Sequence, residues 1–445
     1  VQVEAKTSFV GVRRFLIKAS GKTHTLQGWD ESEPAIVKRA ADVSMQEQSL
    51  LSAYKYRLYP SGVQEMRFKR SLHALCELYN TLRAEKIQKY QQHRNSLSRT
   101  GLRELALRVR QNSPKLQDVY SQVSQNVADR VVYAFKNYFE GRARFPRSKK
   151  FEDYRSLTYP QSGFKLADGR LHLSKIGKVR IFQHRPLEGT VRRLTIKYAV
   201  GEWYAIFLTE KAALAKPKIN RIPGQKIRGA DLGLEKFATL DNAESAEYPK
   251  FLRVAEEKIK HLQRQLARKR KGSKRRRALA LQLARLHMHV ARQREDWQNK
   301  LVNTIFKHAD MLVLEKLNVA SMLRNHPLAK AISDASWSRF TVKCIRKAEM
   351  LGKHVLFVDP WGTSQFCYRC LTWVPKSLTE REHRCPNCEA DLPRDSNSAL
   401  LIRKLGILSC SPSDGGLSPA EPKPLPLRTL RHGQAAALKR EAHNL

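Results

Sequence analysis

The sequence predicts an α/β chain of several domains, in which a small antiparallel β-barrel with a helical insert precedes a second α/β module that carries a zinc ribbon. Three observations lead to this prediction. The chain has 445 residues, more than one typical domain. Its apolar residues recur with the periods of strands and helices in separate blocks. Two Cys-x-x-Cys pairs near its C-terminus have a separation of the kind that zinc sites use.

The expected barrel begins with a strand that has one basic face. In Tyr54–Pro60 aromatic and basic residues alternate, which is typical of such a strand. From Gln64 to about Glu140 the apolar period is helical, and from Leu171 to Glu210 short strands alternate with turns. The expected order is an N-terminal extension over 1–51 that need not be ordered, the first barrel strand over 52–62, the helical insert over 63–145, the rest of the barrel over 146–216 and a linker over 217–227.

The second module combines short apolar strands with long helices. One strand ends at Asp231 and another, Met311–Glu315, ends in a carboxylate as well. Apolar residues at steps of four, three or seven predict long helices between them. The expected segments are a module over 228–362 with a basic helical insertion over 251–308, a zinc ribbon over 363–390, a final segment over 391–406 and a disordered tail over 407–445.

The charge of the chain points to a polyanionic partner. The formal net charge is +42, and so basic a chain repels itself unless a polyanion neutralises it. Nucleic acid is the expected counter-charge, and an anionic membrane surface is the weaker alternative. The sequence has neither an apolar run of membrane-spanning length nor a signal-peptide pattern, so we expect no membrane partner.

Two basic segments are candidates for contacting nucleic acid. Residues 141–150 interrupt a helical pattern, and residues 268–277 join two helical patterns. Residues 141–150 could alternatively form a solvated loop. Residues 268–277 could form a solvated hairpin tip or a localisation-type basic run. The overall charge favours phosphate contact for both segments. With the basic face of the first strand, the candidate contacts are Lys55, Arg57, Arg142, Arg144, Arg147, Lys149, Lys150, Arg268, Lys269, Arg270, Lys271, Lys274, Arg275, Arg276 and Arg277.

The two cysteine pairs predict a structural zinc site. Cys367 and Cys370 form one pair, and Cys385 and Cys388 form the other. Zn²⁺ prefers four thiolates at tetrahedral corners, and four cysteines leave no open position for chemistry. Asp395 follows shortly after, so we expect the rigid module to hold its carboxylate in a fixed direction.

Asp231, Glu315 and Asp395 are the candidate catalytic residues. They lie far apart in the sequence, so only the fold can bring them together. Clustered carboxylates repel unless cations lie between them, and hard oxygen ligands select Mg²⁺ or Mn²⁺. Two such ions can activate a water and stabilise the leaving oxygen in phosphodiester hydrolysis. Without further signals, an acid at a strand end is more often a cap or an ion-pair partner, and both interpretations remain open.

These residues stand in an ordered set of motifs that resembles the TnpB family of transposon-encoded RNA-guided nucleases, which are relatives of the type V CRISPR effectors. The resemblance covers about residues 52–405. The motifs are Gly229–Gly233, Leu312–Leu317, Thr363–Cys370, Cys385–Cys388 and Arg394–Ala399. Family members often have an aliphatic residue at position 230, Gly after each Cys pair and Ala at position 398. Here those positions hold Ala230, Leu371, Glu389 and Ser398, and none of these changes removes a ligand or an acid.

The resemblance implies an RNase H-like (RuvC) nuclease domain whose catalytic acids match Asp231, Glu315 and Asp395. It also implies that the barrel is a wedge domain and the helical insert a recognition lobe. Together they would grip a guide RNA transcribed from the transposon end and read a short motif beside a double-stranded DNA target. Guide pairing would then read the target sequence. We expect a monomer or weak dimer that uses Mg²⁺ or Mn²⁺ for cleavage and Zn²⁺ for structure. The resemblance also implies a cytoplasmic, nucleoid-associated prokaryotic protein.

Three other functions compete with this prediction. A type V CRISPR effector with a separate guide would differ in the neighbouring DNA rather than in the protein. A guided repressor without cleavage typically lacks at least one acid, whereas all three positions are filled here. A conventional transposase is disfavoured by the zinc ribbon placed directly before the last acid and by the long N-terminal half.

Overall fold

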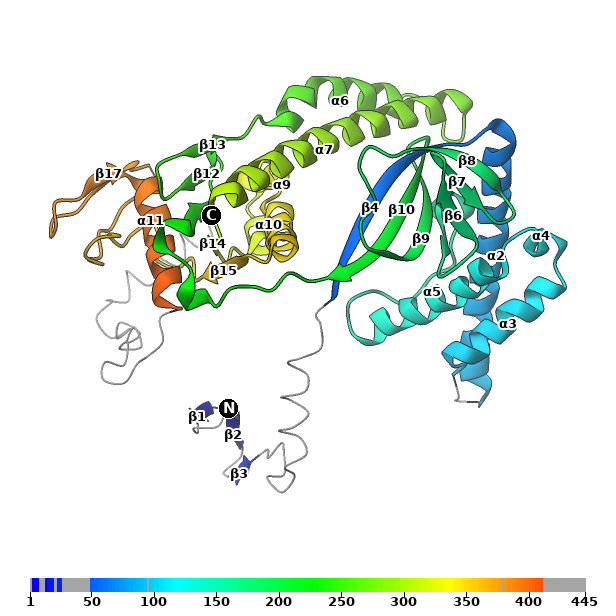
Figure 1. The fold of residues 1–445 in the computed structure, drawn as a ribbon, viewed down its shortest axis with the longest axis horizontal. Helices are drawn as coiled ribbons and strands as arrows, with labels where there is room; N and C mark the ends of the chain where they lie inside the picture. Colours follow the sequence, from blue (N-terminus) through cyan, green and yellow to red (C-terminus); the bar gives the residue numbers. More distant parts are fainter. Residues whose placement is uncertain are drawn as a thin grey trace. The chain divides into compact units, whose positions relative to one another are not determined.

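The computed structural model describes residues 2–7, 13–19, 22–25, 49–93, 96–377 and 379–410. It contains two units, Val1–Gln48 and Ser49–Leu445 (Figure 1). In the first unit β1 (Gln2–Thr7), β2 (Arg13–Ala19) and β3 (Lys22–Thr25) form an antiparallel sheet in chain order. The expected N-terminal extension thus contains paired strands. Residues 26–48, and residues 411–445 of the expected tail, lie outside the described residues.

The second unit begins with a seven-stranded antiparallel sheet. Its order is β5-β9-β10-β4-β8-β7-β6, so the first strand of the unit lies at the centre. Tyr56 of β4 is opposite Ala205 of β10, a pairing that spans the whole helical insert. The strands are β4 (Ser49–Tyr59), β5 (Ser156–Tyr159), β6 (Phe164–Ala167), β7 (Arg170–Leu173), β8 (Gly177–Phe182), β9 (Thr190–Ala199) and β10 (Glu202–Ala212).

The expected barrel is not closed, which corrects the prediction. In the part of the chain that the structure describes, the outer strands β5 and β6 do not pair with each other. Both strands have four residues, and their side chains rather than their backbones meet: the rings of Tyr159 and Phe164 lie 6.3 Å apart. The Tyr159 hydroxyl donates to the Ser174 carbonyl at 3.1 Å. Aromatic packing thus fills the seam that ladder hydrogen bonds would close in a barrel.

The helical insert packs on this sheet. Phe68 of the first helix is fully buried, and its ring stacks on that of Trp203 at 4.7 Å. Val123, Val127 and Val131 recur at every fourth position of the last helix and are buried, as their spacing predicts. The insert comprises α2 (Gly62–His93), α3 (Arg99–Gln111), α4 (Pro114–Gln117) and α5 (Ser121–Phe139), and the short helix η1 (Phe151–Asp153) follows it.

A mixed five-stranded sheet forms the second half of this unit. Its order is β13-β12-β11-β14-β15, in which β11, β14 and β15 are parallel and the other two strands are antiparallel. The strands are β11 (Ile227–Asp231), β12 (Lys236–Leu240), β13 (Ser245–Glu247), β14 (Met311–Glu315) and β15 (His354–Val358). The connection from the first sheet contains η2 (Ile219–Arg221) and η3 (Gly224–Lys226).

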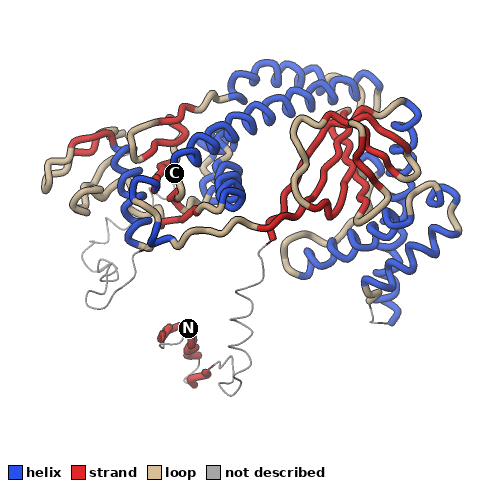
Figure 2. Tube along the Cα trace, in the orientation of Figure 1, coloured by secondary structure: helices blue, strands red, loops and turns tan. Residues whose placement is uncertain are grey.

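Helices cover both faces of the five-stranded sheet. Leu312 shares a buried cluster with Phe340, whereas its neighbour Val313 shares another with Ile402. This alternation explains the uninterrupted apolar run of β14, because a parallel strand buried on both faces has no polar side. The helices are α6 (Phe251–Ala267), α7 (Lys274–His308), α8 (Val319–Met322), α9 (His326–Ala335), α10 (Trp337–Leu351) and α11 (Arg394–Leu408). Figure 2 shows α6 and α7 as long helices side by side.

The cysteine segment lies between β15 and α11. It contains the short hairpin of β16 (Glu382–Arg384) and β17 (Asp391–Pro393). Helix α11 ends at Leu408, two residues beyond the expected end of the ordered chain. Among the described residues, no helix combines the length and apolar character needed to cross a membrane. The predicted class, α/β with several domains, is confirmed.

Candidate functional site

Two of the candidate acids lie side by side at the carboxyl edge of the five-stranded sheet. Strands β11 and β14 are parallel neighbours, with Ala230 opposite Leu314. Asp231 and Glu315 are the next residues along each strand and end it. In open α/β sheets, ligands bind outside the carboxyl ends of strands, where side chains from adjacent strands converge.

Helix α11 brings the third acid to the same edge. Asp395 stands in the first turn of α11, where the helix dipole favours a carboxylate. The helix packs against β11 at Gly229, where an added Cβ would lie 2.6 Å from the Arg403 nitrogen and closer still to the Ala399 carbonyl. The missing side chain of Gly229 therefore lets α11 approach the strand that carries Asp231.

The electrostatics show that the three acids interact. Burial raises the pKa of Asp231 well above its usual range, and the charges of Glu315 and Asp395 raise it further, while Arg394 opposes them. Burial also raises the pKa of Glu315, and a hydrogen bond from the Thr363 hydroxyl counteracts part of this effect. Ionising the whole set is therefore unfavourable unless positive charge enters.

The spacing of the acids differs from that of a compact single-ion site. Within the described ranges, the only group of three or more His, Cys, Asp or Glu ligand atoms that all lie within 4.8 Å of one another is the cysteine quartet. The three carboxylates are therefore spread more widely than the ligands of the cysteine site.

The cysteine quartet has the geometry of a zinc site. The Sγ atoms of Cys367 and Cys388 are 3.6 Å apart, and those of Cys370 and Cys385 are 3.5 Å apart. A tetrahedron with Zn–S bonds of about 2.3 Å has S···S edges of about 3.8 Å. Four thiol groups, two of them buried, thus fit a tetrahedral thiophilic ion such as Zn²⁺ and leave no open position.

Each cysteine pair is shaped by a tight turn at the following residue. The Leu371 nitrogen donates to the Cys367 carbonyl, and the Glu389 nitrogen donates to the Cys385 carbonyl, both at 3.0 Å. Leu371 has φ 60° and Glu389 has φ 59°, in the left-handed region that favours glycine. The two departures from the family pattern that follow the cysteine pairs therefore place side chains in a strained backbone conformation.

A buried asparagine joins the cysteine module to the helix that bears the third acid. Asn397 is fully buried, accepts from the Tyr368 nitrogen at 3.0 Å and donates to the Phe366 carbonyl at 2.8 Å. Lys404 donates to the carbonyls of Tyr368 and Arg369, each at 3.0 Å. The sequence motifs include Asn397 and Thr363, but their positioning roles were missed because both depend on contacts between distant segments.

The predicted basic strand and loop are partly engaged in internal contacts. Lys55 lies over the Tyr204 ring at 4.2 Å, and Arg57 forms an ion pair with Glu202. Lys149 lies over the Tyr79 ring at 4.7 Å. Arg142 forms an ion pair with Glu140, whereas Arg144, Arg147 and Lys150 are exposed on the loop.

In the predicted hairpin tip, one arginine has a structural role and the other cations are exposed. Ser273 caps α7, its Oγ accepting from the Arg276 nitrogen at 3.1 Å. The Arg276 guanidinium turns back to donate to the carbonyls of Leu266 and Lys269 and so closes the hairpin. Exposed cations remain at Arg268, Lys269, Arg270, Lys271, Lys274, Arg275 and Arg277. Cations in the first turn of a helix oppose its dipole, so the placement of the last three is favourable only beside an anion.

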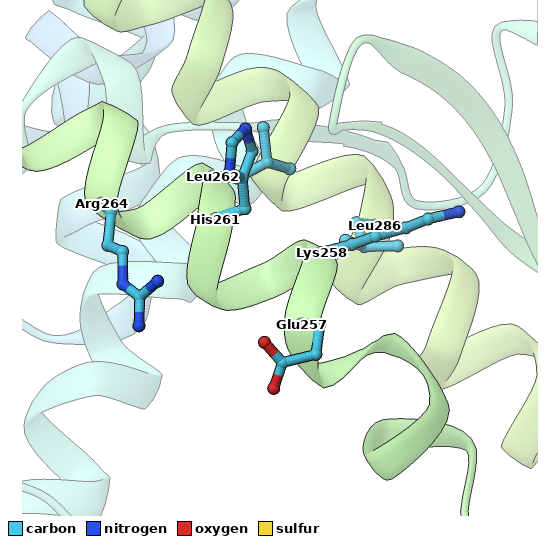
Figure 3. A pocket seen from close by; sticks show the side chains of 6 residues that line it. All are labelled: Glu257, Lys258, His261, Leu262, Arg264 and Leu286. Atoms are coloured by element: carbon cyan, nitrogen blue, oxygen red, sulfur yellow. The ribbon is translucent and has the colours of Figure 1, made fainter.

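A surface depression of about 630 Å³ lies away from the acids. It lies between α6 and α7 (Figure 3), and Leu286 of α7 contributes to it. The other lining residues come from α6 and are Glu257, Lys258, His261, Leu262 and Arg264. None of the candidate catalytic or cysteine residues lines this depression.

Comparisons with known proteins define the class of fold. The structure is similar to a chain in the "Cryo-EM structure of the Cas12f1-sgRNA-target DNA complex", with a TM-score of 0.52, 11% sequence identity and coverage of 80% of this chain and 99% of that chain. The described chain therefore has an α/β multidomain fold that resembles Cas12f1. Two family profiles agree: OrfB_IS605, described as a probable transposase, matches residues 213–326, and a Cas12f1-like TNB domain matches residues 337–402.

Relatives in sequence place the chain more narrowly. A "Putative RNA-guided DNA endonuclease" of Streptomyces pristinaespiralis is 28% identical over 83% of this chain and 92% of its own length. InsQ of Escherichia coli (strain K12), which carries the same description, is 28% identical over 81% of this chain and 94% of its own length. The TnpB-like protein L79 of Acanthamoeba polyphaga mimivirus is 25% identical over 31% of this chain and 27% of its length. The predicted resemblance to TnpB is confirmed.

Proposed function

We propose that this protein is an RNA-guided DNA endonuclease that hydrolyses the DNA strand complementary to a bound guide RNA, beside a short target-adjacent motif. The observation that carries the proposal is the mutual approach of Asp231, Glu315 and Asp395 from three separate elements. The names of the two relatives that align over most of their length support the same activity.

The proposed catalytic part is an RNase H-like (RuvC) domain built on the five-stranded sheet. Its support is the pair of adjacent parallel strands that end in acids, with a helix that adds the third. The seven-stranded sheet would be the wedge domain, and α2–α5 the recognition lobe. The exposed cations at the α6–α7 tip and on the 141–150 loop would contact nucleic-acid phosphates.

The three acids would hold Mg²⁺ or Mn²⁺. A pair of ions about 3.5–4 Å apart needs carboxylates spread around it, which agrees with a set wider than one compact site. Bound divalent ions supply activation of a water and stabilisation of the leaving oxygen. The chain's own contribution is orientation: the Thr363 hydroxyl donates to Glu315, and Asn397 fixes the start of the helix that bears Asp395.

The zinc module would serve as the anchor of this third acid. Asn397 and Lys404 of α11 bind backbone groups of the first cysteine turn. A metal that locks this turn therefore also limits the positions open to Asp395. We propose a monomer or weak dimer as the working form, with a guide RNA from the transposon end and double-stranded DNA of the nucleoid as partners.

The test begins with the nucleic acid that copurifies with the protein. Expression with the native flanking DNA, followed by sequencing of bound RNA, should yield one discrete RNA that ends in a variable segment. With that guide and Mg²⁺, the protein should cut a matched duplex, and Asp231→Ala should bind the duplex without cutting it. Cutting by Asp231→Ala would contradict the catalytic assignment, and heterogeneous RNA that salt removes would contradict guided recognition.

Two alternatives predict different results in the same test. A guided repressor would bind the matched duplex, but the unmodified protein would leave it intact with either metal. A type V CRISPR effector would cut it only with a guide encoded in a repeat array and not with RNA from the flanking DNA.

A further inference from the structure

Three aromatic rings cluster around the first cysteine turn: Trp361 and Phe366 precede it in the chain, and Trp373 follows it. The rings of Trp361 and Trp373 stack with centroids 5.7 Å apart and an angle of 22°. Phe366 meets Trp373 edge to face at 4.8 Å and Trp361 at 5.8 Å. An isolated bridge pairs Phe366 with Trp373, so both supporting rings belong to the same turn of the cysteine module.

Trp361 is the exposed member of this cluster. It is 58% exposed, whereas Phe366 and Trp373 are half-buried beneath it. The backbone of Trp361 is held by contacts before and after it. Its backbone nitrogen donates to the Asp359 carboxylate at 2.9 Å, and Gly362 follows with φ +74°. A Cβ on Gly362 would lie 2.7 Å from the Phe366 ring, so the chain lies directly against its support. The outer surface of Trp361 is thus a rigid aromatic platform rather than a loose side chain.

The platform lies beside the proposed active site. Thr363 follows Trp361 by two residues and donates its hydroxyl hydrogen bond to Glu315. Two residues of chain span at most about 7 Å, so Trp361 is that close to the residue that touches the acid. The Thr363 side chain and its hydrogen bond add to this length, and successive nucleotides of one strand rise by about 3.4 Å, so the platform lies a few nucleotides from the Glu315 carboxylate.

We propose that Trp361 stacks on a nucleobase of the DNA strand being cut, a few nucleotides from the scissile phosphate. The inference rests on the proposed function and names how the same site positions its substrate. Aromatic stacking suits a guided nuclease because every base has a π-face, so the contact tolerates any target sequence that the guide selects. Trp373 holds the platform from behind and does not contact the substrate.

The test is single-turnover cleavage by the guide-loaded protein with Mg²⁺. The variants are Trp361→Ala, which removes the platform, Trp361→Phe, which keeps an aromatic ring, and Trp361→Leu, which keeps apolar bulk. Val342→Ala on α10 is the matched control, since Val342 is 47% exposed and belongs to the same half of the unit. The cleavage rate of each variant is measured on an intact duplex. It is also measured on a series of duplexes that each carry one abasic nucleotide at a different position near the cut.

Loss of one base stack should slow cleavage of the intact duplex by about 5- to 150-fold in Trp361→Ala and Trp361→Leu, which corresponds to 1–3 kcal/mol. Trp361→Phe should recover most of the rate, and Val342→Ala should match the unmodified protein. One abasic position should slow the unmodified protein to a similar degree without slowing Trp361→Ala further. A merely structural role of Trp361 would not produce this dependence on one base.

Two results would overturn the inference. One is cleavage of the intact duplex by Trp361→Ala at the unmodified rate. The other is an abasic effect that is equally large in Trp361→Ala and the unmodified protein. Unchanged melting temperature and zinc content of Trp361→Ala and Trp361→Leu exclude misfolding as the cause of their lost rate. Absence of guided cutting by the unmodified protein would instead refute the proposed function itself.

Discussion

Replacing Gly229 with alanine should separate α11 from the strand that carries Asp231. The new Cβ would lie 2.6 Å from the Arg403 nitrogen, whereas ordinary contacts begin near 3.4 Å. Strand β11 cannot retreat, because it is paired with β12 on one side and β14 on the other. Its backbone is also tied to Asp241 by hydrogen bonds of 3.0 and 3.2 Å. The helix therefore has to withdraw by at least about 0.8 Å.

The size of this shift sets the expected effects. Overpacking of a buried contact costs about 1–3 kcal/mol, which lowers Tm by about 2–12 °C for a domain of this size. A displacement near 1 Å at a catalytic group costs about 100-fold in rate, so cleavage should fall by about two orders of magnitude. The activity loss should exceed what the fraction of unfolded protein explains at 25 °C.

The assay compares melting curves and single-turnover cleavage rates of the guide-loaded variant and a matched control. Gly62→Ala is the control, because no atom lies within 4 Å of its added Cβ and the helix start accepts alanine. It should keep both Tm and rate. A Gly229→Ala protein with unchanged rate would refute the argument that close packing of α11 on β11 positions Asp395.

Three further predictions concern charge, strain and metal. Burial raises the pKa of Asp231 and Glu315, so the folded protein retains protons that the unfolded chain releases; without Mg²⁺, its stability should fall as pH rises from about 4 through the raised values. Asp231→Asn should flatten this dependence in melting curves, and a steeper fall would contradict it. Leu371→Gly and Glu389→Gly should each raise Tm of the zinc-loaded protein through release of about 0.5–1 kcal/mol of left-handed strain, and a lower Tm would argue against strain. Cys385→Ser should release zinc, measured by elemental analysis, and lower Tm; unchanged metal content and Tm would rule out the zinc site.

The strand ends that carry the first two acids follow from local patterns. The apolar runs before Asp231 and Glu315 predict buried strands, and both acids indeed end strands. Their adjacency depends on the parallel register of β11 and β14, which a helical insertion of two long helices separates in the sequence. No local signal specifies which strands become neighbours across such an insertion.

The neighbours of each strand in the seven-stranded sheet are likewise not specified by local sequence. Alternating residues at 54–60 predict a strand, but its central place between β10 and β8 depends on pairings across the helical insert. The predicted closure into a barrel was wrong because strand propensity does not report whether two short edges meet through hydrogen bonds or through side chains. The contact between the Tyr159 and Phe164 rings, which decides this for β5 and β6, becomes visible only in the folded structure.

Several cations of the basic segments have internal partners that the sequence does not reveal. Arg57, Arg142 and Arg276 belong to basic segments, yet each has an internal partner in Glu202, Glu140 or the hairpin carbonyls. A run of arginines in a sequence does not distinguish a guanidinium that closes a turn from one that faces solvent. The partner of each cation depends on side-chain geometry, so the composition predicts a polyanion without predicting which residues meet it.

The position of the third acid, Asp395, depends on contacts between segments that are distant in the sequence. Asp395 approaches Asp231 only because Gly229 admits α11 and because Asn397 ties that helix to the cysteine turn. The same turn carries Phe366, one of the two rings that support Trp361, while Thr363 of the adjoining loop orients Glu315. A metal bound in the cysteine quartet would therefore restrain an acid and the proposed base-stacking platform together. Loss of zinc should for this reason reduce catalysis more than it reduces binding of the guided duplex.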